Sequence, residues 1–336
     1  MARAANRERQ PEQRLATGCS CELYARATER AALAGARWLG QGDQEGAEEA
    51  ASSGMRAVLE ALPMSGRIVI GVTEGTPRLA VDEEIGAGGE HVDLALDPLE
   101  GRGVVARGGS GAMAMIAVGG RGSLLTLPEM YMRQMAVGPL ARGRIDLLKP
   151  VTENIEAIAK AYGRRVGDVT TIVLDRPRHH DLIEEIRTTG ARIKLIPDGT
   201  VTASISTAIR GTNDHLAIGI GGTRQAVLSA AALRCVGGEL QAQLWPTSRR
   251  EIEAARAQGV DDHERVFTMD DLAPGEIVFA ATGVSNGDLL RGVRFLADSA
   301  RTHSLVMCTR CNWVRFVDGI HFFARERREE VRLPGY

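Results

Sequence analysis

The second half of the chain alternates short apolar strands with helices, and this alternation limits its fold more than any other feature of the sequence. The pattern predicts strands over residues 170–174, 192–196, 215–220 and 277–281, and helices over residues 180–188, 201–210 and 225–235. Strands that alternate with helices form a parallel sheet with helices on its faces. We therefore expect an α/β fold whose ligands bind at the carboxyl ends of the strands.

Small residues follow three of these strands, in the pairs Asp198-Gly199, Gly221-Gly222 and Thr282-Gly283. Small residues at such positions let backbone N–H groups approach an anion, and the N-terminus of the helix behind them favours negative charge. Three such turns in succession indicate an anion site more strongly than any one of them alone.

The first half begins with two amphipathic helices, over residues 21–39 and then up to residue 62, with Asp43 as the expected N-cap of the second. Strands are predicted over residues 67–71 and 92–96. Residues 113–118 and 123–127 predict a β-hairpin that turns at a glycine-rich segment.

Bulk properties narrow the possible functions. The formal net charge of −2 gives no basic field for nucleic acid, and no apolar run approaches the roughly 20 residues that span a membrane. Residues 1–18 lack the apolar region of a secretion signal and predict a disordered leader. The few cysteines, odd in number, favour a reducing, cytoplasmic location.

The five cysteines do not predict a disulfide framework, because their number is odd and small for a chain of 336 residues. Cys19 and Cys21 form one C-x-C pair, and Cys308 and Cys311 form one C-x-x-C pair. Neither pair has a second pair or a histidine at ligand spacing near it in the sequence. We therefore expect ordinary, partly buried thiols rather than a zinc site.

The segment Asp97-Pro98-Leu99-Glu100-Gly101 is the sharpest local motif. It follows a predicted strand directly and projects two carboxylates from one turn. Hard cations such as Mg²⁺ prefer carboxylate and phosphate oxygens, and two such ions can hold a phosphate and an attacking water in line. The alternative for this motif taken alone is a solvated turn.

Segments along most of the chain, from about residue 29 to residue 323, resemble the class II fructose-1,6-bisphosphatase family. The segments that carry the resemblance include LALDPLEG, PEMYMRQMAVGP, LDRPRHHDLIEEIRTTGAR, LIPDGTVTASI and AATGVSNGDLL. The resemblance implies a layered αβαβα sandwich of the sugar-phosphatase (fructose-bisphosphatase/inositol monophosphatase-like) superfamily. It also implies a homo-oligomer that removes the 1-phosphate of fructose 1,6-bisphosphate with Mg²⁺ or Mn²⁺, with sedoheptulose 1,7-bisphosphate as a further substrate of some members.

The resemblance assigns roles to eight residues. It implies four metal-binding acids: Glu48, Glu74, Asp97 and Glu100. All of these except Glu48 are also expected to take part in catalysis. It implies a substrate-binding set of one aromatic residue, two phosphate-binding arginines and one ligand of a sugar hydroxyl: Tyr131, Arg176, Arg178 and Asp198. His179 and His180 follow the arginines and either contact phosphate or are solvated or capped.

Three departures from the family pattern concern the metal site. The family reads E-G-E-x-D-E-A-P after the first strand, whereas residues 72–77 read V-T-E-G-T-P, which leaves Glu74 as the candidate acid there. Arg102 stands where the family has a threonine, and Gln225 stands where it has a metal-binding glutamate, next to Arg224. Lost carboxylates weaken Mg²⁺ binding, and an arginine can replace a metal's charge but not its activation of water. Other acids can also take over, and the nearest are Asp82, Glu83, Glu84 and Glu90.

The sequence thus leaves three functions open. The first is an active metal-dependent phosphatase of a phosphorylated sugar, with a remodelled site. The second is a family member that binds a sugar phosphate without hydrolysing it, and the third is an assembly subunit of an active relative. In each case we expect residues 19–165 and 300–336 to form the metal-binding half, and residues 166–299 to form the half that binds the sugar phosphate.

Overall fold

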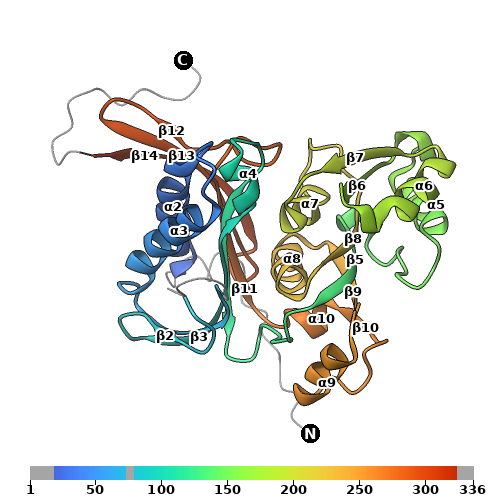
Figure 1. Cartoon of the computed structure of the whole chain (residues 1–336), viewed down its shortest axis with the longest axis horizontal. Helices are drawn as coiled ribbons and strands as arrows, with labels where there is room; N and C mark the ends of the chain where they lie inside the picture. Colours follow the sequence, from blue (N-terminus) through green and yellow to red (C-terminus); the bar gives the residue numbers. More distant parts are fainter. Residues whose placement is uncertain (1–18, 73–78, 324–336) are drawn as a thin grey trace, which may run out of the picture.

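The computed structural model describes residues 19–72 and 79–323, and in this part of the chain the strands form two mixed sheets (Figure 1). The first sheet has eight strands in the order β12-β13-β11-β4-β3-β1-β2, with β14 also paired to β13. Its strands are β1 (Met64–Ile70), β2 (Glu84–Ile85), β3 (Glu90–Glu100), β4 (Met113–Gly120), β11 (Ile277–Gly283), β12 (Arg294–Phe295), β13 (Ser299–Cys308) and β14 (Trp313–Phe322). Only β1 and β3 run parallel among these pairs.

The second sheet has six strands in the order β10-β9-β5-β8-β6-β7 within the described residues. Its strands are β5 (Tyr131–Val137), β6 (Thr170–Leu174), β7 (Arg192–Ile196), β8 (Leu216–Gly222), β9 (Glu239–Leu244) and β10 (Val266–Thr268). Strand β6 runs parallel to β7 and β8, whereas β5 pairs antiparallel with both β8 and β9. The prediction of a parallel sheet is therefore right for β6, β7 and β8. It is wrong for the fourth predicted strand, β11, which lies in the first sheet and pairs antiparallel with β4 and β13.

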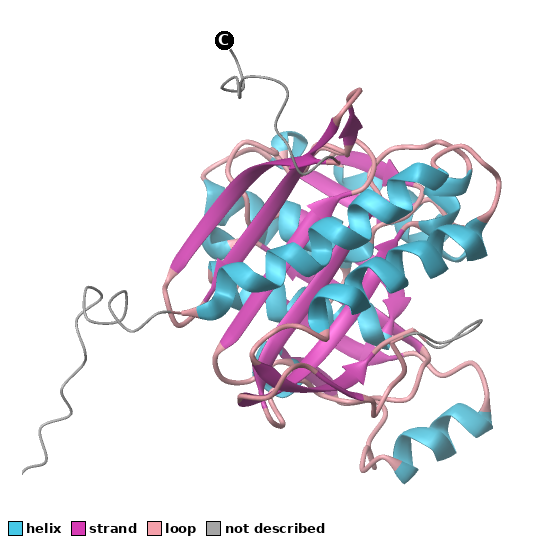
Figure 2. Ribbon diagram, turned by 90° about the vertical axis from the view of Figure 1, so that its left-hand side faces the viewer, coloured by secondary structure: helices cyan, strands magenta, loops and turns pink. Residues whose placement is uncertain are grey.

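Helices cover the outer face of each sheet and fill the space between them (Figure 1). The longer helices are α2 (Leu23–Gly35), α3 (Gln44–Leu59), α5 (Val151–Tyr162), α6 (His180–Thr189), α8 (Thr223–Val236) and α9 (Arg249–Ala257). The shorter ones are α4 (Arg102–Ala106), α7 (Thr200–Ser206) and α10 (Met269–Leu272), and the 3₁₀ turns are η1 (Ser20–Glu22), η2 (Ala36–Trp38), η3 (Pro139–Ala141), η4 (Val166–Asp168) and η5 (Pro177–His179). Helices α2 and α3 lie across the outer face of the first sheet, as Figure 2 shows. Helices α7 and α8 lie between the sheets, and α5 and α6 lie beyond the second sheet.

Three buried apolar clusters match these layers. One lies between the sheets and includes Met115 of β4, Met132 of β5 and Leu228 of α8. A second joins α2 and α3 to the first sheet, and a third joins α5 and α6 to the second. Strand β4 is buried on both faces because it lies inside the first sheet with helices on either side, which explains its unbroken apolar run.

Small residues bring α2 and α3 close together. Ala27, Ala31, Ala47 and Ala51 have no exposed surface. A Cβ atom added to Gly54 of α3 would lie 2.6 Å from the carbonyl oxygen of Arg30 in α2, so only glycine allows this approach. The second helix begins as expected, since the Asp43 side chain accepts a hydrogen bond from the Gly46 backbone at 2.9 Å.

The predicted hairpin over residues 113–127 does not form. Strand β4 pairs with β3 and β11, and residues 123–127 are not a strand. The backbone N–H of Leu125 instead donates to Leu272 of α10 at 2.9 Å, and Leu124 is buried between the sheets. Residues 123–127 connect the first sheet to the second, and their contacts with α10 and the core between the sheets prevent them from pairing with β4 as a hairpin.

The residues that form each sheet do not coincide with the two halves expected from the sequence. Strand β5 and helix α5 precede residue 166 but belong to the second sheet and its outer layer. Strand β11 precedes residue 300 but lies between β4 and β13 in the first sheet. The division into a metal half and a sugar half stays a prediction, while the expected leader, residues 1–18, lies outside the described residues.

Candidate functional site

The carboxylates of Asp97 and Glu100 face the same way because β3 contains a β-bulge between them. In a regular strand, residues three apart point to opposite faces. Here Asp97 pairs with Met115 and Glu100 pairs with Met113, so β3 has one more residue than β4 between the two pairs. Met113 and Met115 both face the core between the sheets. Residues directly opposite each other share a face, so both carboxylates point towards the second sheet.

The local sequence explains why the bulge forms at this point. Pro98 cannot donate a ladder hydrogen bond, and prolines inside sheets therefore occur at bulges. The Leu99 backbone N–H donates to the Asp97 carboxylate at 3.2 Å, which closes the turn. Gly101 then has φ of 89°, a conformation that favours glycine, and helix α4 begins directly after it.

Glu100 connects the two layers through hydrogen bonds. Its carboxylate accepts from the backbone N–H of Val201 at 2.9 Å and from the Thr202 hydroxyl at 2.8 Å. Both donors belong to α7, which begins just after Asp198 and Gly199. The site therefore forms where the end of β3 meets the start of α7.

Burial makes these two acids unusual. Asp97 is 7% exposed and Glu100 is 5% exposed. Burial is the main cause that raises the pKa of Asp97 to about 6; Arg224 opposes the rise, whereas Glu48 and Asp198 add to it. Burial, and then the negative charge of Asp97, raise the pKa of Glu100 to about 8. Burial thus favours the protonated form of both acids in the absence of a cation.

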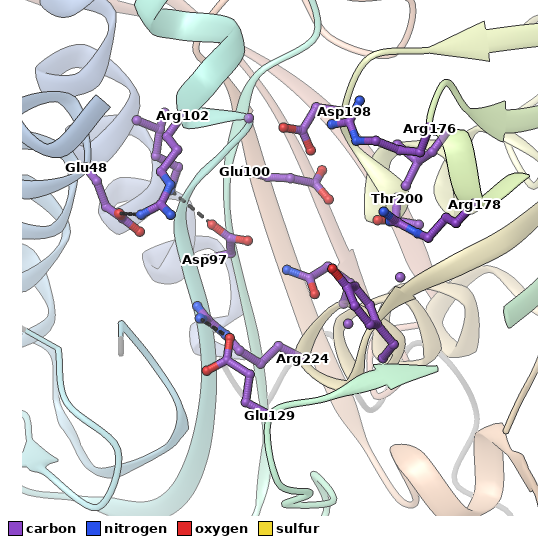
Figure 3. Close-up of a pocket in the computed structure, with 17 residues that line it drawn as sticks. Glu48, Asp97, Glu100, Arg102, Glu129, Arg176, Arg178, Asp198, Thr200 and Arg224 are labelled. Carbon is purple, nitrogen blue, oxygen red and sulfur yellow. Dashed lines mark hydrogen bonds and ion pairs between the residues drawn. The ribbon is translucent and has the colours of Figure 1, made fainter. Parts of the chain in front are cut away.

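Two arginines lie against this cluster, as Figure 3 shows. The Arg102 guanidinium forms an ion pair with Glu48 of α3 at 2.7 Å and lies between Glu48 and Asp97. Arg224, in the first turn of α8, is 3.7 Å from the Glu129 carboxylate. Glu48, which the resemblance assigns to metal binding, is therefore engaged by Arg102 in this structure.

These residues line a cavity of about 290 Å³ between the two sheets. The first sheet and its helices contribute Glu48, Asp97, Glu100 and Arg102, whereas Tyr131 comes from β5 and Arg176 and Arg178 come from the turn after β6. The remaining lining residues are Leu99, Gly101, Glu129, Leu174, Asp198, Thr200, Gly221, Gly222, Arg224 and Gln225. The wall with Glu48, Asp97 and Glu100 is thus mainly acidic although it includes Arg102, and the opposite wall with Arg176 and Arg178 is mainly basic although it includes Asp198.

The arginines of the basic wall are held in place by backbone contacts. Arg176 donates to the carbonyl oxygens of Asp175 at 2.9 Å and Pro197 at 2.6 Å. Arg178 donates to the Ile220 carbonyl at 3.0 Å, and its guanidinium carbon lies 5.0 Å from the centre of the Tyr131 ring. A guanidinium has five N–H donors, so these contacts leave donors for phosphate oxygens. The N-terminus of α8 opens onto the same cavity at Gly222, which adds a favourable partial charge for an anion.

His179 has a structural role instead of a phosphate contact. Its Nδ1 lies 2.8 Å from the Leu174 carbonyl, and its Nε2 accepts from the Ile220 backbone at 2.8 Å. Burial lowers its pKa, which agrees with a neutral ring that donates from Nδ1. His179 therefore fixes β8 against the turn that carries Arg176 and Arg178.

The structure brings seven of the eight predicted site residues to one cavity. The eighth, Glu74, lies outside the described residues, and its assignment stays a prediction. The sequence did not single out Glu129 or Thr200. Glu129 stands two residues before Tyr131 in the PEMYM motif, and Thr200 directly follows Asp198-Gly199. Both residues therefore lie in or directly beside motifs that the sequence analysis used, so these motifs could have identified them.

The cavity suits a divalent cation at Asp97 and Glu100. Their oxygen donors are those that Mg²⁺ and Mn²⁺ prefer, and a bound cation would favour the ionised form that burial disfavours in both acids. Glu48 would have to leave Arg102 to join them. Asp97 and Glu100 therefore suit a hard cation on the side of the cavity nearest α7. The side nearest α3 suits it less well, because Arg102 already pairs with Glu48 there.

The raised pKa values predict how stability depends on pH without divalent cations. A raised pKa in the folded state stabilises the protein below the pKa of the unfolded state, and this contribution is lost as pH rises through about 6 for Asp97 and about 8 for Glu100. In EDTA, we expect the melting temperature to fall between pH 5 and pH 9, and Mg²⁺ to raise it most at the alkaline end. Differential scanning fluorimetry across this range measures both effects.

Glu100→Gln provides the comparison for this prediction. The amide does not titrate, so the difference in melting temperature between the variant and the unmodified protein should change between pH 7 and pH 9. A constant difference across this range would show that Glu100 does not titrate there.

Comparison with known proteins agrees with this geometry. The family model described as "Bacterial fructose-1,6-bisphosphatase, glpX-encoded" matches residues 19–321. A "D-fructose 1,6-bisphosphatase class 2/sedoheptulose 1,7-bisphosphatase" of Synechococcus sp. (strain JA-3-3Ab) is 42% identical, over 91% of this chain and 96% of the relative. Proteins with the same name from Microcystis aeruginosa and Synechococcus elongatus are each 40% identical, over 90% and 88% of this chain and 96% and 94% of the relatives. The chain belongs to the class II fructose-1,6-bisphosphatase family.

Proposed function

We propose that this protein is a metal-dependent phosphatase of sugar bisphosphates, with fructose 1,6-bisphosphate and sedoheptulose 1,7-bisphosphate as its substrates. The observation that carries the proposal is the cavity with one acidic and one basic wall. The two bisphosphates are those named for its relatives. We also place the fold in the sugar-phosphatase superfamily, which the helix–sheet–helix–sheet–helix order of its layers supports (Figure 1).

Each wall has a distinct task in this proposal. Arg176 and Arg178 bind and orient phosphate oxygens, and Asp198 accepts a hydrogen bond from a sugar hydroxyl. Asp97 and Glu100 hold the divalent cation. When bound, Mg²⁺ or Mn²⁺ would polarise the phosphoryl group and acidify the attacking water.

Phosphate release from a panel of sugar mono- and bisphosphates, with Mg²⁺ or Mn²⁺, tests this function. We expect the two bisphosphates to be hydrolysed faster than fructose 6-phosphate or glucose 6-phosphate, and EDTA to abolish the reaction. Folded protein that releases no phosphate from any of them would overturn the proposal.

The basic wall gives a separate prediction about substrate binding. Arg178→Ala should raise KM for fructose 1,6-bisphosphate by about tenfold or more and change kcat less, because it removes contacts made in both the ground and transition states. Arg187→Ala is the matched control, since Arg187 lies on α6, the helix that directly follows the η5 turn of Arg178, is exposed, and pairs with Glu184 outside the cavity. Steady-state kinetics of both variants measure the difference. Equal KM values would remove Arg178 from the substrate site.

One observation favours the second candidate, binding of a sugar phosphate without hydrolysis. Arg102 pairs with Glu48, and Gln225 lines the cavity where the family has an acid. Binding of fructose 1,6-bisphosphate that is unaffected by Mg²⁺, with no phosphate released, would support this alternative. The homo-oligomer that the resemblance implies and the expected cytoplasmic location stay predictions.

A further inference from the structure

Four of the five cysteines of the chain meet at one point of the fold, far from the cavity. Cys19 precedes η1 and Cys21 lies within it, whereas Cys308 ends β13 and Cys311 lies in the turn before β14. All four sulfur atoms lie within 4.8 Å of one another. Cys21 and Cys311 are 290 positions apart in the sequence, so the two pairs looked unrelated. Each pair is in fact the second pair that the other lacked.

The distances between the sulfur atoms fit a single metal ion. The Sγ atoms of Cys19 and Cys308 are 3.8 Å apart, and those of Cys21 and Cys311 are 3.9 Å apart. A tetrahedral zinc ion with Zn–S bonds of about 2.3 Å places its sulfur ligands about 3.8 Å apart. A polynuclear iron–sulfur cluster binds its cysteines through different iron atoms, which spreads the sulfurs more widely.

The surroundings support a preformed site. The Cys311 backbone N–H lies 3.4 Å from the Cys308 sulfur, a contact that favours the thiolate form of a ligand. The turn is fixed because the Thr309 backbone N–H donates to the Ile277 carbonyl at 3.0 Å, and the Thr309 hydroxyl accepts from the Ile277 N–H at 2.8 Å. Cys21 and Cys308 are buried, and an ion pair between Glu22 and Arg315 joins the same two segments.

We propose that Cys19, Cys21, Cys308 and Cys311 bind one zinc ion in a closed, tetrahedral, structural site. Thiolates are soft ligands and select zinc over the Mg²⁺ or Mn²⁺ of a carboxylate site. Four protein ligands leave no position for water or substrate, so the ion stabilises the fold and does not take part in the reaction. It connects the segment before α2 to the β13–β14 turn.

The position of the site separates it from the cavity. Arg310, between the two cysteines of the turn, pairs with Glu90, the first residue of β3, at 3.4 Å. Asp97 and Glu100 lie towards the other end of this strand. At about 3.3 Å per residue, seven to ten residues of strand correspond to roughly 23–33 Å. A metal at the cysteines is therefore distinct from one at the carboxylates.

Metal analysis of the full chain tests the proposal. The protein is purified untagged, without chelating resin or added zinc, and its metals are measured by mass spectrometry. We expect about one zinc per chain. The Cys19→Ser/Cys21→Ser double variant should lose this zinc, and its melting temperature should fall by roughly 5–10 °C. Cys235→Ser is the matched control, because Cys235 is the one cysteine outside the cluster, and it should keep the zinc.

A second measurement applies even if the double variant does not fold. Zinc in the unmodified protein is exchanged for Co²⁺, and the absorption spectrum is recorded. Tetrahedral thiolate coordination gives a sulfur-to-cobalt charge-transfer band in the near ultraviolet, which a carboxylate site does not produce. We expect this band in the unmodified protein and in Cys235→Ser.

Each of four results would overturn the proposal. Protein without zinc whose four cluster thiols react freely with a thiol reagent has no such site. Disulfides between the cluster cysteines in anaerobically purified protein would show a redox pair instead. Zinc that stays bound in a folded Cys19→Ser/Cys21→Ser variant would show that it binds at another site. Iron in place of zinc would show that the cluster binds a different metal.

Discussion

Asp97→Asn should reduce Mg²⁺-dependent phosphate release from fructose 1,6-bisphosphate by about a thousandfold. Asp97 is buried at the end of β3, and its carboxylate faces Glu100 and the basic wall of the cavity. An amide of nearly the same shape keeps the packing but removes one negative charge from the cation site. The variant should therefore fold, bind the substrate, and lose the increase in melting temperature that Mg²⁺ gives the unmodified protein.

Asp93→Asn is the control for this result. Asp93 is also a buried acid on β3, but it accepts from the Gly122 backbone at 2.6 Å and pairs with Arg121 at 3.3 Å, away from the cavity. This variant should be less stable but should keep its response to Mg²⁺ and its phosphatase activity at low temperature. Equal activity of Asp97→Asn and the unmodified protein would remove Asp97 from the catalytic site, and equal losses in both variants would show an effect of folding alone.

The double variant Arg102→Thr/Gln225→Glu should bind Mg²⁺ at least about tenfold more tightly. It removes a positive charge that engages Glu48 and adds a carboxylate at the start of α8. Both changes make the cavity more negative, and the first releases Glu48 for the cation. Isothermal titration calorimetry with Mg²⁺, with and without fructose 1,6-bisphosphate, measures the change.

Arg107→Thr provides the matched control for Arg102. Arg107 is the C-cap of the same short helix, is exposed and does not line the cavity. It should leave Mg²⁺ affinity nearly unchanged. If the double variant binds Mg²⁺ no better than Arg107→Thr, the arginine and the amide do not weaken the metal site. Binding that improves while hydrolysis appears for the first time would favour the non-hydrolysing alternative for the natural sequence.

Local patterns predicted the elements of the fold better than their connections. Strands β6 and β7 have the predicted bounds because they are short apolar runs between clear turns. The antiparallel insertion of β5 between β8 and β9 could not be predicted, because strand direction and neighbours depend on contacts distant in the sequence. For the same reason, residues 123–127 looked like a strand of a hairpin although they connect the two sheets.

The candidate site was predicted largely from the resemblance, and the residues alone explain less of it. The motif Asp97-Pro98-Leu99-Glu100 indicated a cation site, but the ion pair of Arg102 with Glu48 joins residues 54 positions apart and has no local pattern. The raised pKa values of Asp97 and Glu100 also come from burial between the sheets, which no segment encodes by itself. The cysteine cluster is the clearest case, since neither half of it suggested the other.

The bulge in β3 makes the candidate site depend on the number of residues in the strand as well as on their chemistry. One extra residue between the pairs Asp97–Met115 and Glu100–Met113 sets the side to which Glu100 points. Deleting one residue there would restore regular alternation, and it would turn one of the two acids towards α2 and α3. A deletion of one codon would then separate the pair of acids while leaving both in the sequence. In related chains, the number of residues in this turn therefore decides whether the two acids lie on the same side of the sheet.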